Sequence, residues 1–347
     1  MIIRHEAYDL SRQNTFGMKV SCRLYVEVTE PEDLLTLNFD ALPQPLFVMG
    51  GGSNLLFTRD FPGTVLHMAN QGITLNPVIS TKAEGRAEKS ATVAAGVVFD
   101  DFCAWAAAEG LWGPENLSLI PGEVGASAVQ NIGAYGVEAK DIIDTVHAFD
   151  RQERRIVDIP GADCGYGYRT SRFKTDWKGR HIITAVTFRL STVPQPKLDY
   201  GGVRKALGDR EPAPQVIRDT IIEIREQKLP DPKEIGSAGS FFCNPVIERE
   251  HFERIVAIAK AENGPEYEVP HYDVGDRMKV PAAWMIDQCG FKGMRLGGAQ
   301  VYPKQPLVIV NATGTATPEE IVALEQRVIG TIKEKYGIEL HPEVEHV

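Results

Sequence analysis

Glycines at positions 122, 125, 133 and 136 lie in a nearly uncharged stretch that runs from residue 119 to residue 136. Glycine accepts positive φ and has no Cβ atom, so the backbone N–H groups of such a stretch can approach a bound group closely. A tortuous surface loop would contain more Asp, Lys and Ser and fewer apolar residues. The stretch is too irregular for a helix or a strand, and we interpret it as a loop that wraps around a large cofactor.

Three consecutive glycines at 50–52 form a second cluster, which Ser53 and Asn54 extend. The cluster follows an apolar run at 45–49, which predicts a buried strand that leads into a turn. It is neither a P-loop nor the dinucleotide fingerprint, because no Gly-Lys-Ser/Thr and no amphipathic helix follow it. A concavity of backbone amides with two polar side chains can hold a pyrophosphate. A glycine turn can also be a simple tight connection, but two such segments favour a dinucleotide held between two lobes.

The charge balance limits the ligands that this chain can bind. It contains 37 Lys and Arg against 47 Asp and Glu, a formal net charge of −10. Such a balance without a basic stripe argues against nucleic acid or an anionic membrane as a partner. An acidic substrate would need local cations, for which residues 168–174, Lys228 and Lys233 are candidates. Clustered cations of this kind are more often solvated surface, so they do not identify a ligand by themselves.

The elements that must position these residues are mixed helices and strands. Residues 23–190 read mainly as strands, interrupted by a helix at 99–109, and form an α+β region that contains both glycine segments. A second helix is predicted at 215–228, where the following prolines end it and leave Lys228 at its C-terminus. Between them, the proline-rich residues 191–214 indicate a linker or an excursion over a site.

The C-terminal third has its own signals. Residues 236–245 resemble another glycine-rich turn, and a short helix is expected at 282–288. Thr317 and Glu320 form a capping box with Pro318 at the first helical position, which predicts a helix that reaches Tyr336. Residues 338–347 read as a final strand that contains Glu343.

Length and composition indicate two or three domains of an ordinary globular protein, with 347 residues and 43% hydrophobic residues. Neither a signal peptide nor an apolar run of membrane-spanning length is evident, so a cytoplasmic location and no membrane partner are expected. The cysteines are odd in number and lack any Cys-x-x-Cys pair, which predicts small buried thiols rather than disulfides or a zinc site, at Cys22, Cys103, Cys164, Cys243 and Cys289.

Seven segments in order resemble the motifs of the UDP-N-acetylenolpyruvoylglucosamine reductase (MurB) family, flavoproteins of peptidoglycan precursor synthesis. They are residues 50–54, 115–122, 130–136, 166–174, 228–233, 239–245 and 341–344. The resemblance covers nearly the whole chain and includes the Tyr200 segment of the longer family type.

This resemblance implies an α+β fold. An FAD-binding fold of the vanillyl-alcohol-oxidase/PCMH type, made of two α+β subdomains, would occupy residues 1–70 and 71–215, the latter including the Tyr200 loop. An α+β substrate-binding domain would occupy 216–347, with a C-terminal strand that returns to the active site. Non-covalent FAD would be held by Gly50, Gly51, Gly52, Ser53, Asn54, Pro121, Gly122, Gly125, Ser127, Ile132 and Gly133. The substrate-binding residues would be Tyr135, Tyr200, Lys228 and Asn244.

The reaction implied by the resemblance uses NADPH as a co-substrate to reduce UDP-N-acetylglucosamine enolpyruvate to UDP-N-acetylmuramate through FAD. Arg169 and Glu343 would lie beside the substrate carboxylate, and Ser240 would donate the proton. A glutamate at that point is repulsive unless it is protonated or anchors the arginine, and both alternatives stay open. No metal is implied. Considered without the family, Ser240 is a turn residue and Glu343 an exposed glutamate.

Two other functions remain possible. A flavin oxidase of the same fold could act on a hydroxy acid or a sugar lactone, but such oxidases often tether FAD through His or Cys, and neither glycine segment contains one. A non-catalytic module could bind a flavin or a nucleotide sugar, although the joint presence of Arg169, Ser240 and Glu343 argues against it. Oxygen consumption with a sugar substrate would favour the oxidase. A purified protein that does not take up FAD would favour the non-catalytic module.

Overall fold

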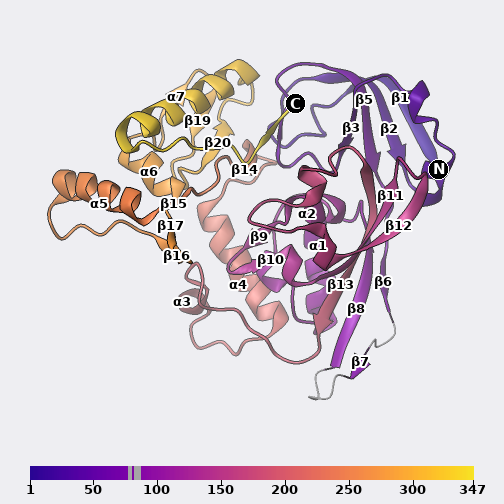
Figure 1. The fold of residues 1–347 in the computed structure, drawn as a ribbon, viewed down its shortest axis with the longest axis horizontal. Helices are drawn as coiled ribbons and strands as arrows, with labels where there is room; N and C mark the ends of the chain where they lie inside the picture. Colours follow the sequence, from indigo (N-terminus) through magenta and orange to yellow (C-terminus); the bar gives the residue numbers. More distant parts are fainter. Residues whose placement is uncertain (77–79, 82–86) are drawn as a thin grey trace. The chain divides into compact units, whose positions relative to one another are not determined.

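The computed structural model describes residues 1–76, 80, 81 and 87–347 (Figure 1). The chain divides into two compact units. Unit 1 comprises residues 1–13, 20–52 and 60–227, and unit 2 comprises residues 14–19, 53–59 and 228–347. Each unit is described by itself, and the division into three domains stays a prediction.

The first sheet of unit 1 leads to the glycine cluster at 50–52. Its strand order is β1 (Ile2–Asp9), β2 (Ser21–Val28), β5 (Phe61–Met68) and β3 (Leu46–Met49). Strands β1 and β2 are antiparallel, whereas β5 runs parallel to both β2 and β3. A Cβ atom at Gly63 would lie 1.9 Å from the carbonyl oxygen of Pro45, so only glycine lets β5 pass this close to the start of β3.

The second sheet of unit 1 is antiparallel, with the order β12, β11, β13, β8 and β6, and with β7 paired to β8. The strands are β6 (Ile73–Leu75), β7 (Ser80–Thr81), β8 (Ala87–Ala94), β11 (Ile143–Asp150), β12 (Arg155–Pro160) and β13 (His181–Ser191). Apolar residues on β11 and β13, among them Val146, Phe149 and Phe188, enter the large core of this unit.

Two helices pack on this sheet. Helix α1 (Phe99–Ala108) stacks its Phe102 ring on Phe188 of β13, with ring centroids 4.5 Å apart. Helix α2 (Val124–Gln130) contacts β13 and β8. The hairpin of β9 (Gly133–Ala134) and β10 (Val137–Glu138) follows α2. Short 3₁₀ helices occur at Pro31–Leu35, Phe39–Ala41, Glu115–Leu117, Ala139–Asp141, Gly161–Cys164 and Arg172–Lys174.

Helices α3 (Val203–Leu207) and α4 (Pro214–Lys228) complete unit 1 with a small core of their own. Its buried residues are Trp112, Leu198, Val203, Leu207, Ile217, Ile221 and Ile224. Arg218 of α4 also makes a two-point ion pair with Asp100 of α1, with N···O distances of 2.5 and 2.9 Å. Helix α4 is therefore fixed to α1 by charge and to the preceding segment by apolar packing.

Unit 2 contains a four-stranded sheet in the order β14 (Gly236–Ser240), β20 (Val308–Asn311), β19 (Ala299–Val301) and β18 (Arg295–Leu296). A second sheet has the order β15 (Val246–Glu248), β17 (Arg277–Lys279) and β16 (Tyr272–Val274). The pair β21 (Glu345–His346) and β4 (Leu55–Leu56) is parallel. The helices are α5 (Arg249–Asn263), α6 (Ala282–Gln288) and α7 (Pro318–Tyr336).

Elements with local signals in the sequence are confirmed. The strand at 45–49 is β3, and the helices at 99–109, 215–228 and 282–288 are α1, α4 and α6. Helix α7 starts at the expected capping box, since Thr317 Oγ1 accepts from the N–H of Glu320 and the Glu320 carboxylate accepts from the N–H of Thr317. Gly337, at φ 67°, ends it.

Four expectations were wrong in part. The glycine-rich stretch contains helix α2, because Val124 and Ala128 are buried in the core and stabilise a helix that its composition does not favour. Residues 191–214 are not a linker, since they contain α3 and pack on α4. The turn at 236–245 begins as strand β14, which is irregular between Ser237 and Ser240. Only Glu345 and His346 of the final segment form a strand.

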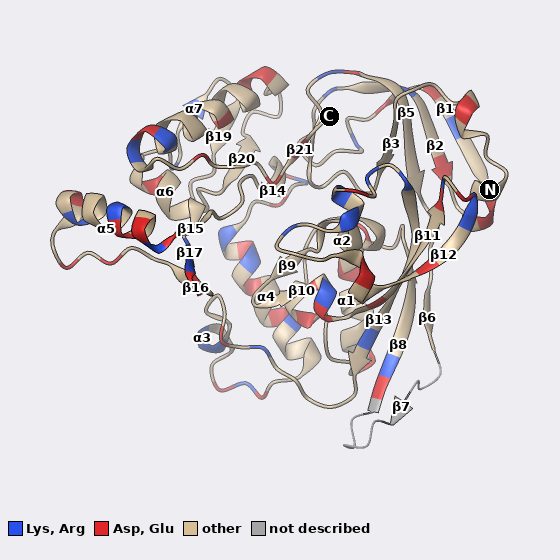
Figure 2. Cartoon of the chain, viewed as in Figure 1, with Lys and Arg blue, Asp and Glu red and all other residues tan. Residues whose placement is uncertain are grey.

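The cysteines form no disulfide in the part of the chain that the structure describes, where Cys22, Cys103 and Cys164 are buried and Cys243 and Cys289 are partly exposed. Figure 2 shows acidic and basic residues interspersed along α5, and pairs such as Arg254 with Glu250 join them. In the parts of the chain that the structure describes, no helix has both the length and the apolar character needed to cross a bilayer.

Candidate active site

The structure brings the two glycine segments together in unit 1. A Cβ atom at Gly50 would lie 3.2 Å from the Cβ of Ala126, and one at Gly51 would lie 3.7 Å from the Cα of Gly122. Gly52 has a φ of 63°, which suits the turn after β3. The segment at 50–52 therefore lies against residues 122–126, and the Glu123 carboxylate reaches the same place, since a Cβ atom at Gly50 would lie 3.2 Å from its Oε2.

A carboxylate and a histidine that the sequence analysis missed lie beside these two segments. Glu123 precedes α2, and both of its oxygens lie 3.0 Å from Nε2 of His67 on β5. Because a carboxylate only accepts, Nε2 carries the proton of the imidazole. The two side chains are 13% and 16% exposed, so the pair is largely shielded. A single Glu in an otherwise uncharged stretch was the only signal in the sequence.

Other residues expected to hold the cofactor lie in and around α2. Ser127 is buried and its hydroxyl donates to the carbonyl oxygen of Val124. Gly125 lies close to β8, since a Cβ atom there would be 3.0 Å from the Cβ of Ala95. Pro121 is exposed, and Ile132 packs against the core. These residues share one short stretch of unit 1.

The glycine-rich stretch is anchored at its start by Asp100. The N–H of Leu119, a residue with φ 59°, donates to Asp100 Oδ1 over 2.5 Å. Burial alone would raise the pKa of Asp100, but the hydrogen bonds from Arg218 and from Leu119 outweigh it and lower this pKa. Asp100 is therefore a carboxylate near neutral pH and joins α1, α4 and residue 119.

Arg169 lies in a tight turn and contacts the glycine-rich stretch. Its φ is 55°, and the backbones of Gly167 and Thr170 bond to each other in both directions across the turn. Nη2 of Arg169 donates to the carbonyl oxygen of Gly133 over 2.7 Å, and its guanidinium lies 5.5 Å from the ring centroid of Tyr168. The structure therefore brings Arg169 to Gly133.

Tyr135 and Tyr200 also lie together in unit 1. A Cβ atom at Gly201 would be 2.7 Å from Cδ1 of Tyr135, and one at Gly136 would be 3.2 Å from Cβ of Tyr200. The buried amide of Asn116 fixes this pair of segments, because it donates to the carbonyl oxygens of both Tyr135 and Lys197. Sequence motifs included Asn116 but gave it no role.

Arg225 of α4 lies beside Tyr135. Burial raises the pKa of the Tyr135 hydroxyl, and the nearby charge and hydrogen bond of Arg225 oppose this rise. Burial also lowers the pKa of Arg225, with the Tyr135 and Asp100 side chains acting against it. Nothing in the sequence distinguished Arg225 from the other arginines of its helix.

The predicted residues of unit 2 form a second group. Ser240 ends β14, and the next residue, Phe241, accepts from the N–H of Glu343 over 2.8 Å. Nδ2 of Asn54 donates to the carbonyl oxygen of Glu343, and the N–H of Glu345 donates to the carbonyl oxygen of Asn54. Asn54, Ser240 and Glu343 are therefore brought together although they are remote in sequence.

Three further predicted residues belong to unit 2. The side chain of Asn244 accepts from the N–H of Ala282 over 2.9 Å, at the start of α6. Lys228 is the exposed last residue of α4, and Ser53 is partly exposed. By contrast, Arg169, Tyr135, Tyr200 and the glycines of the cofactor segments are residues of unit 1.

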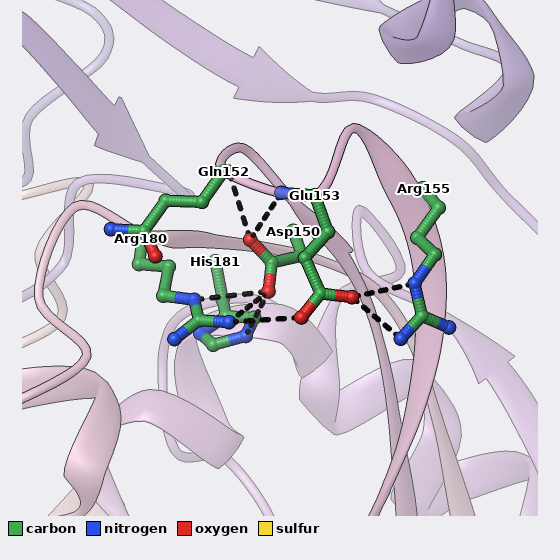
Figure 3. Close-up of polar contacts among 6 residues, drawn as sticks. All are labelled: Asp150, Gln152, Glu153, Arg155, Arg180 and His181. Atoms are coloured by element: carbon green, nitrogen blue, oxygen red, sulfur yellow. Dashed lines mark hydrogen bonds and ion pairs between the residues drawn. The ribbon is translucent and has the colours of Figure 1, made fainter.

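A depression of about 460 Å³ in unit 1 lies elsewhere, since its lining includes none of the predicted site residues. Figure 3 shows the polar cluster that borders it. Asp150 accepts from Nε and Nη2 of Arg180 over 2.9 and 2.5 Å and from the N–H groups of Gln152 and Glu153. These contacts stabilise the end of β11, so the cluster has a structural explanation.

No group of three or more His, Cys, Asp or Glu side chains suited to a metal occurs in residues 1–76, 80, 81 and 87–347.

Two family models match this chain. Residues 23–156 match the FAD binding domain, and residues 231–347 match the C-terminal domain of UDP-N-acetylenolpyruvoylglucosamine reductase. The first match contains both glycine segments, and the second contains Ser240, Asn244 and Glu343. The two glycine segments fit an FAD, because the missing Cβ atoms at 50 and 51 let them lie against each other, so that one ligand can contact both.

Curated proteins named UDP-N-acetylenolpyruvoylglucosamine reductase are similar over their whole length. Those of Bacteroides fragilis and Porphyromonas gingivalis are 44% and 42% identical to this chain and cover 99% and 100% of it, and the same shares of their own lengths are matched. The crystal structure of the reductase from Thermus caldophilus matches with a TM-score of 0.65 at 22% identity, covering 100% of this chain and 98% of its own. The predicted fold class and an FAD-binding domain are thereby confirmed.

Proposed function

This chain belongs to the UDP-N-acetylenolpyruvoylglucosamine reductase family, and we propose that it reduces UDP-N-acetylglucosamine enolpyruvate to UDP-N-acetylmuramate with NADPH as the reductant. The similarity to reductases of that name over the whole chain is the observation that carries the proposal. The protein thereby acts in the synthesis of a peptidoglycan precursor.

FAD, reduced by NADPH, supplies the hydride for this reaction. We assign the turn at Gly50, Gly51 and Gly52 to its pyrophosphate, because successive backbone N–H groups of a glycine turn can approach a bound anion closely. The residues that we assign to FAD are Gly50, Gly51, Gly52, Ser53, Asn54, Pro121, Gly122, Gly125, Ser127, Ile132 and Gly133. Neither segment contains the His or Cys of a covalent tether.

The charge that develops on the substrate is the main obstacle to the reaction. Addition of hydride to the terminal carbon of the enolpyruvyl double bond places a negative charge on the adjacent carbon and its carboxylate. A planar guanidinium can stabilise this carboxylate with two parallel hydrogen bonds, and Arg169 is the arginine that we assign to it. Removal of one such donor typically lowers kcat by a factor of about 10² to 10³.

Ser240 completes the reduction by protonating the carbon that carries this charge. A hydroxyl is a weak acid, but the carbanion is a strong base, so the transfer is downhill when the two atoms are in contact. The serine alkoxide then recovers a proton from water. Glu343, whose N–H donates to the carbonyl oxygen of Phe241 directly after Ser240, is assigned with Arg169 to the substrate carboxylate.

Tyr200, Lys228 and Asn244 are assigned to the UDP diphosphate or to NADPH, and Tyr135 is assigned to the substrate. Lys228 is exposed and offers a point charge for a phosphate on a protein with a net charge of −10. Tyr135 and Tyr200 belong to neighbouring segments of unit 1, since a Cβ atom at Gly136 would lie 3.2 Å from Cβ of Tyr200. Because NADPH and nucleotide sugars are charged compounds of the cytoplasm, the proposal places the enzyme there.

The deciding experiment separates the two half-reactions. The purified FAD-loaded protein is reduced without oxygen by one equivalent of NADPH, and UDP-N-acetylglucosamine enolpyruvate is then added while the flavin absorbance is recorded. Loss of the oxidised band followed by its return on addition of substrate supports the proposal. Reduction without return would mean another electron acceptor, and a protein unable to take up FAD would overturn the proposal altogether.

A further inference from the structure

The turn that carries Arg169 holds this residue in an unusual backbone conformation. Its φ of 55° is uncommon for a residue with a Cβ atom, so neighbouring contacts must hold the turn. Two backbone hydrogen bonds between Gly167 and Thr170, of 3.0 and 3.3 Å, close it from inside. A side chain from another segment, that of Asn131, also contacts this turn.

Asn131 is fully buried and connects three segments through one amide group. Its Nδ2 donates to the carbonyl oxygen of Gly167 over 2.8 Å and to Oε2 of Glu138 over 3.1 Å. Its Oδ1 accepts from the N–H of Lys140 over 2.9 Å. The residue itself ends α2 at φ 48° and ψ 58°, a left-handed conformation that Asn tolerates better than most residues.

Three contacts join the end of α2 and the residues after it, 129–133, to the Arg169 turn. Ser171 Oγ donates to the carbonyl oxygen of Val129 over 2.5 Å, Asn131 donates to Gly167, and Arg169 donates to Gly133 over 2.7 Å. The two outer contacts start from the turn and reach backbone carbonyls. The contact between Asn131 and Gly167 is made by a side chain outside the turn. A substitution of Asn131 can therefore loosen the turn without changing any residue of the turn itself.

An amide is the one group of this shape that satisfies all of these partners. A carboxylate of the same size keeps the acceptor for Lys140 N–H but loses both donors. It also sets a negative charge against the Gly167 carbonyl oxygen and the Glu138 carboxylate. Glu138 is already paired with the ammonium of Lys140 over 2.6 Å, so that cation is engaged.

We propose that Asn131 is a positioning residue that acts through Gly167 and sets the Arg169 guanidinium for the carboxylate of the substrate. This inference rests on the proposed function, and it names a residue whose own side chain is buried and bonded to protein groups. Its effect is expected on ligands that carry the carboxylate and not on ligands that lack it.

Binding measurements on the FAD-loaded Asn131→Asp variant test the proposal. UDP-N-acetylmuramate carries the carboxylate, whereas UDP-N-acetylglucosamine has the same UDP and sugar without it. By titration calorimetry, we expect the Kd of UDP-N-acetylmuramate to rise about tenfold, which corresponds to the loss of one oriented hydrogen bond. The Kd of UDP-N-acetylglucosamine should change by less than about twofold. If both ligands bind equally more weakly, Asn131 has a general structural role and the proposal is wrong. If the binding of both ligands is unchanged, the proposal is also overturned.

A matched control and a second readout keep the result interpretable. Asn70→Asp changes another buried amide, which donates to the carbonyl oxygen of Thr184, and should not discriminate between the two ligands. Asn131→Gly, which permits the left-handed backbone, should reproduce the selective loss if the aspartate variant folds poorly. In Asn131→Asp, lower pH should restore part of the binding, since a protonated carboxyl can donate again.

Hydrogen exchange separates this inference from the proposed function. If the wild type binds both ligands equally, the assigned role of Arg169 fails, and exchange at the Thr170 amide then decides the positioning role alone. Faster exchange there in Asn131→Asp supports the role of Asn131 in holding the turn. Exchange as slow as in the wild type contradicts it.

Discussion

The guanidinium of Arg169 presents five N–H donors in a plane, and one of its nitrogens reaches the carbonyl oxygen of Gly133 over 2.7 Å. A lysine can keep one such contact but cannot form two parallel bonds with a carboxylate. We therefore expect Arg169→Lys to lower kcat/KM for the enolpyruvyl substrate by about 10². Steady-state kinetics with varied substrate check this value.

The control for this substitution is Arg172→Lys. Arg172 is partly exposed, pairs with Asp176 and stacks over Trp177 at 4.0 Å, so it has local partners of its own. Its replacement should change kcat/KM by less than about threefold, as for most exposed ion pairs. Wild-type turnover in Arg169→Lys would remove Arg169 from the catalytic residues.

Ser240 is the other residue whose loss should be selective. In Ser240→Ala, reduction of the flavin by NADPH should stay nearly unchanged, while reoxidation by the enolpyruvyl substrate should slow by about 10² to 10⁴, the usual range for loss of a general acid. Stopped-flow absorbance measures the two half-reactions separately. Ser237→Ala, on the same strand, is the control and should slow neither step.

If Ser240→Ala slows both half-reactions equally, the loss concerns the fold or the cofactor, and the proton-donor role is wrong.

At the scale of elements, two glycines inside helices make a matched pair. Gly330 lies within α7, and apart from its chain neighbours and the nearby backbone of this helix, no described atom comes within 4 Å of the Cβ that alanine would add there. Gly125 lies within α2, where the same Cβ would be 3.0 Å from the Cβ of Ala95. Helix propensity alone favours alanine at both positions by about 0.5 to 1 kcal/mol.

We therefore expect opposite results from one substitution. Gly330→Ala should raise the free energy of unfolding by about 0.5 to 1 kcal/mol, whereas Gly125→Ala should lower it and also lower the FAD content. Urea titrations and flavin absorbance per mole of protein provide the measurement. A stabilised Gly125→Ala with full FAD content would contradict the close packing of α2 on β8.

The same contrast explains what could be predicted from the sequence. Helix α7 was predictable because its capping box, its first proline and its final glycine are local signals. Helix α2 was not, because packing of Val124 and Ala128 overrides the weak helix propensity of a stretch rich in Gly and Ser. Helix α5, which carries few local signals at its ends, was not identified at all.

The candidate site was predictable only where motifs named its members. The resemblance supplied Arg169, Ser240 and Glu343, and residue types alone assigned the last two to ordinary turn or surface roles. Asn131 and the pair of His67 and Glu123 gave no comparable signal, because their partners lie far away in the sequence. Such contacts follow from the fold and not from spacing.

At the scale of the whole molecule, the Asp150 cluster of Figure 3 predicts how stability depends on pH. Burial would raise the pKa of Asp150, but the hydrogen bonds from Arg180, Glu153 and Gln152 outweigh it and lower this pKa to about 2. Because the folded pKa lies below the unfolded value of about 3.9, the carboxylate stabilises the fold above that value. The contribution, on the order of 2 kcal/mol, is lost as the pH falls from about 4 to 2.

Asp150→Asn should therefore lower the urea midpoint at pH 7 and show a weaker dependence on pH between about 4 and 2 than the wild type. Asp158→Asn is the matched control, since Asp158 is an exposed carboxylate on the neighbouring strand β12, and it should shift the midpoint little. Parallel pH curves for Asp150→Asn and the wild type would show that Asp150 does not set the acid limit.

The interleaved path of the chain determines how this protein can be dissected. Unit 2 takes residues 14–19 and 53–59 from the N-terminal part, where Phe16 packs on Phe241 and β4 pairs with β21. A fragment that starts at residue 228 would lack the ring that covers Phe241 and the strand that receives Glu345. Residues 228–347 therefore cannot be transferred alone as a folding unit. A chimaera with a related protein must take residues 14–19 and 53–59 from the same parent as the C-terminal part.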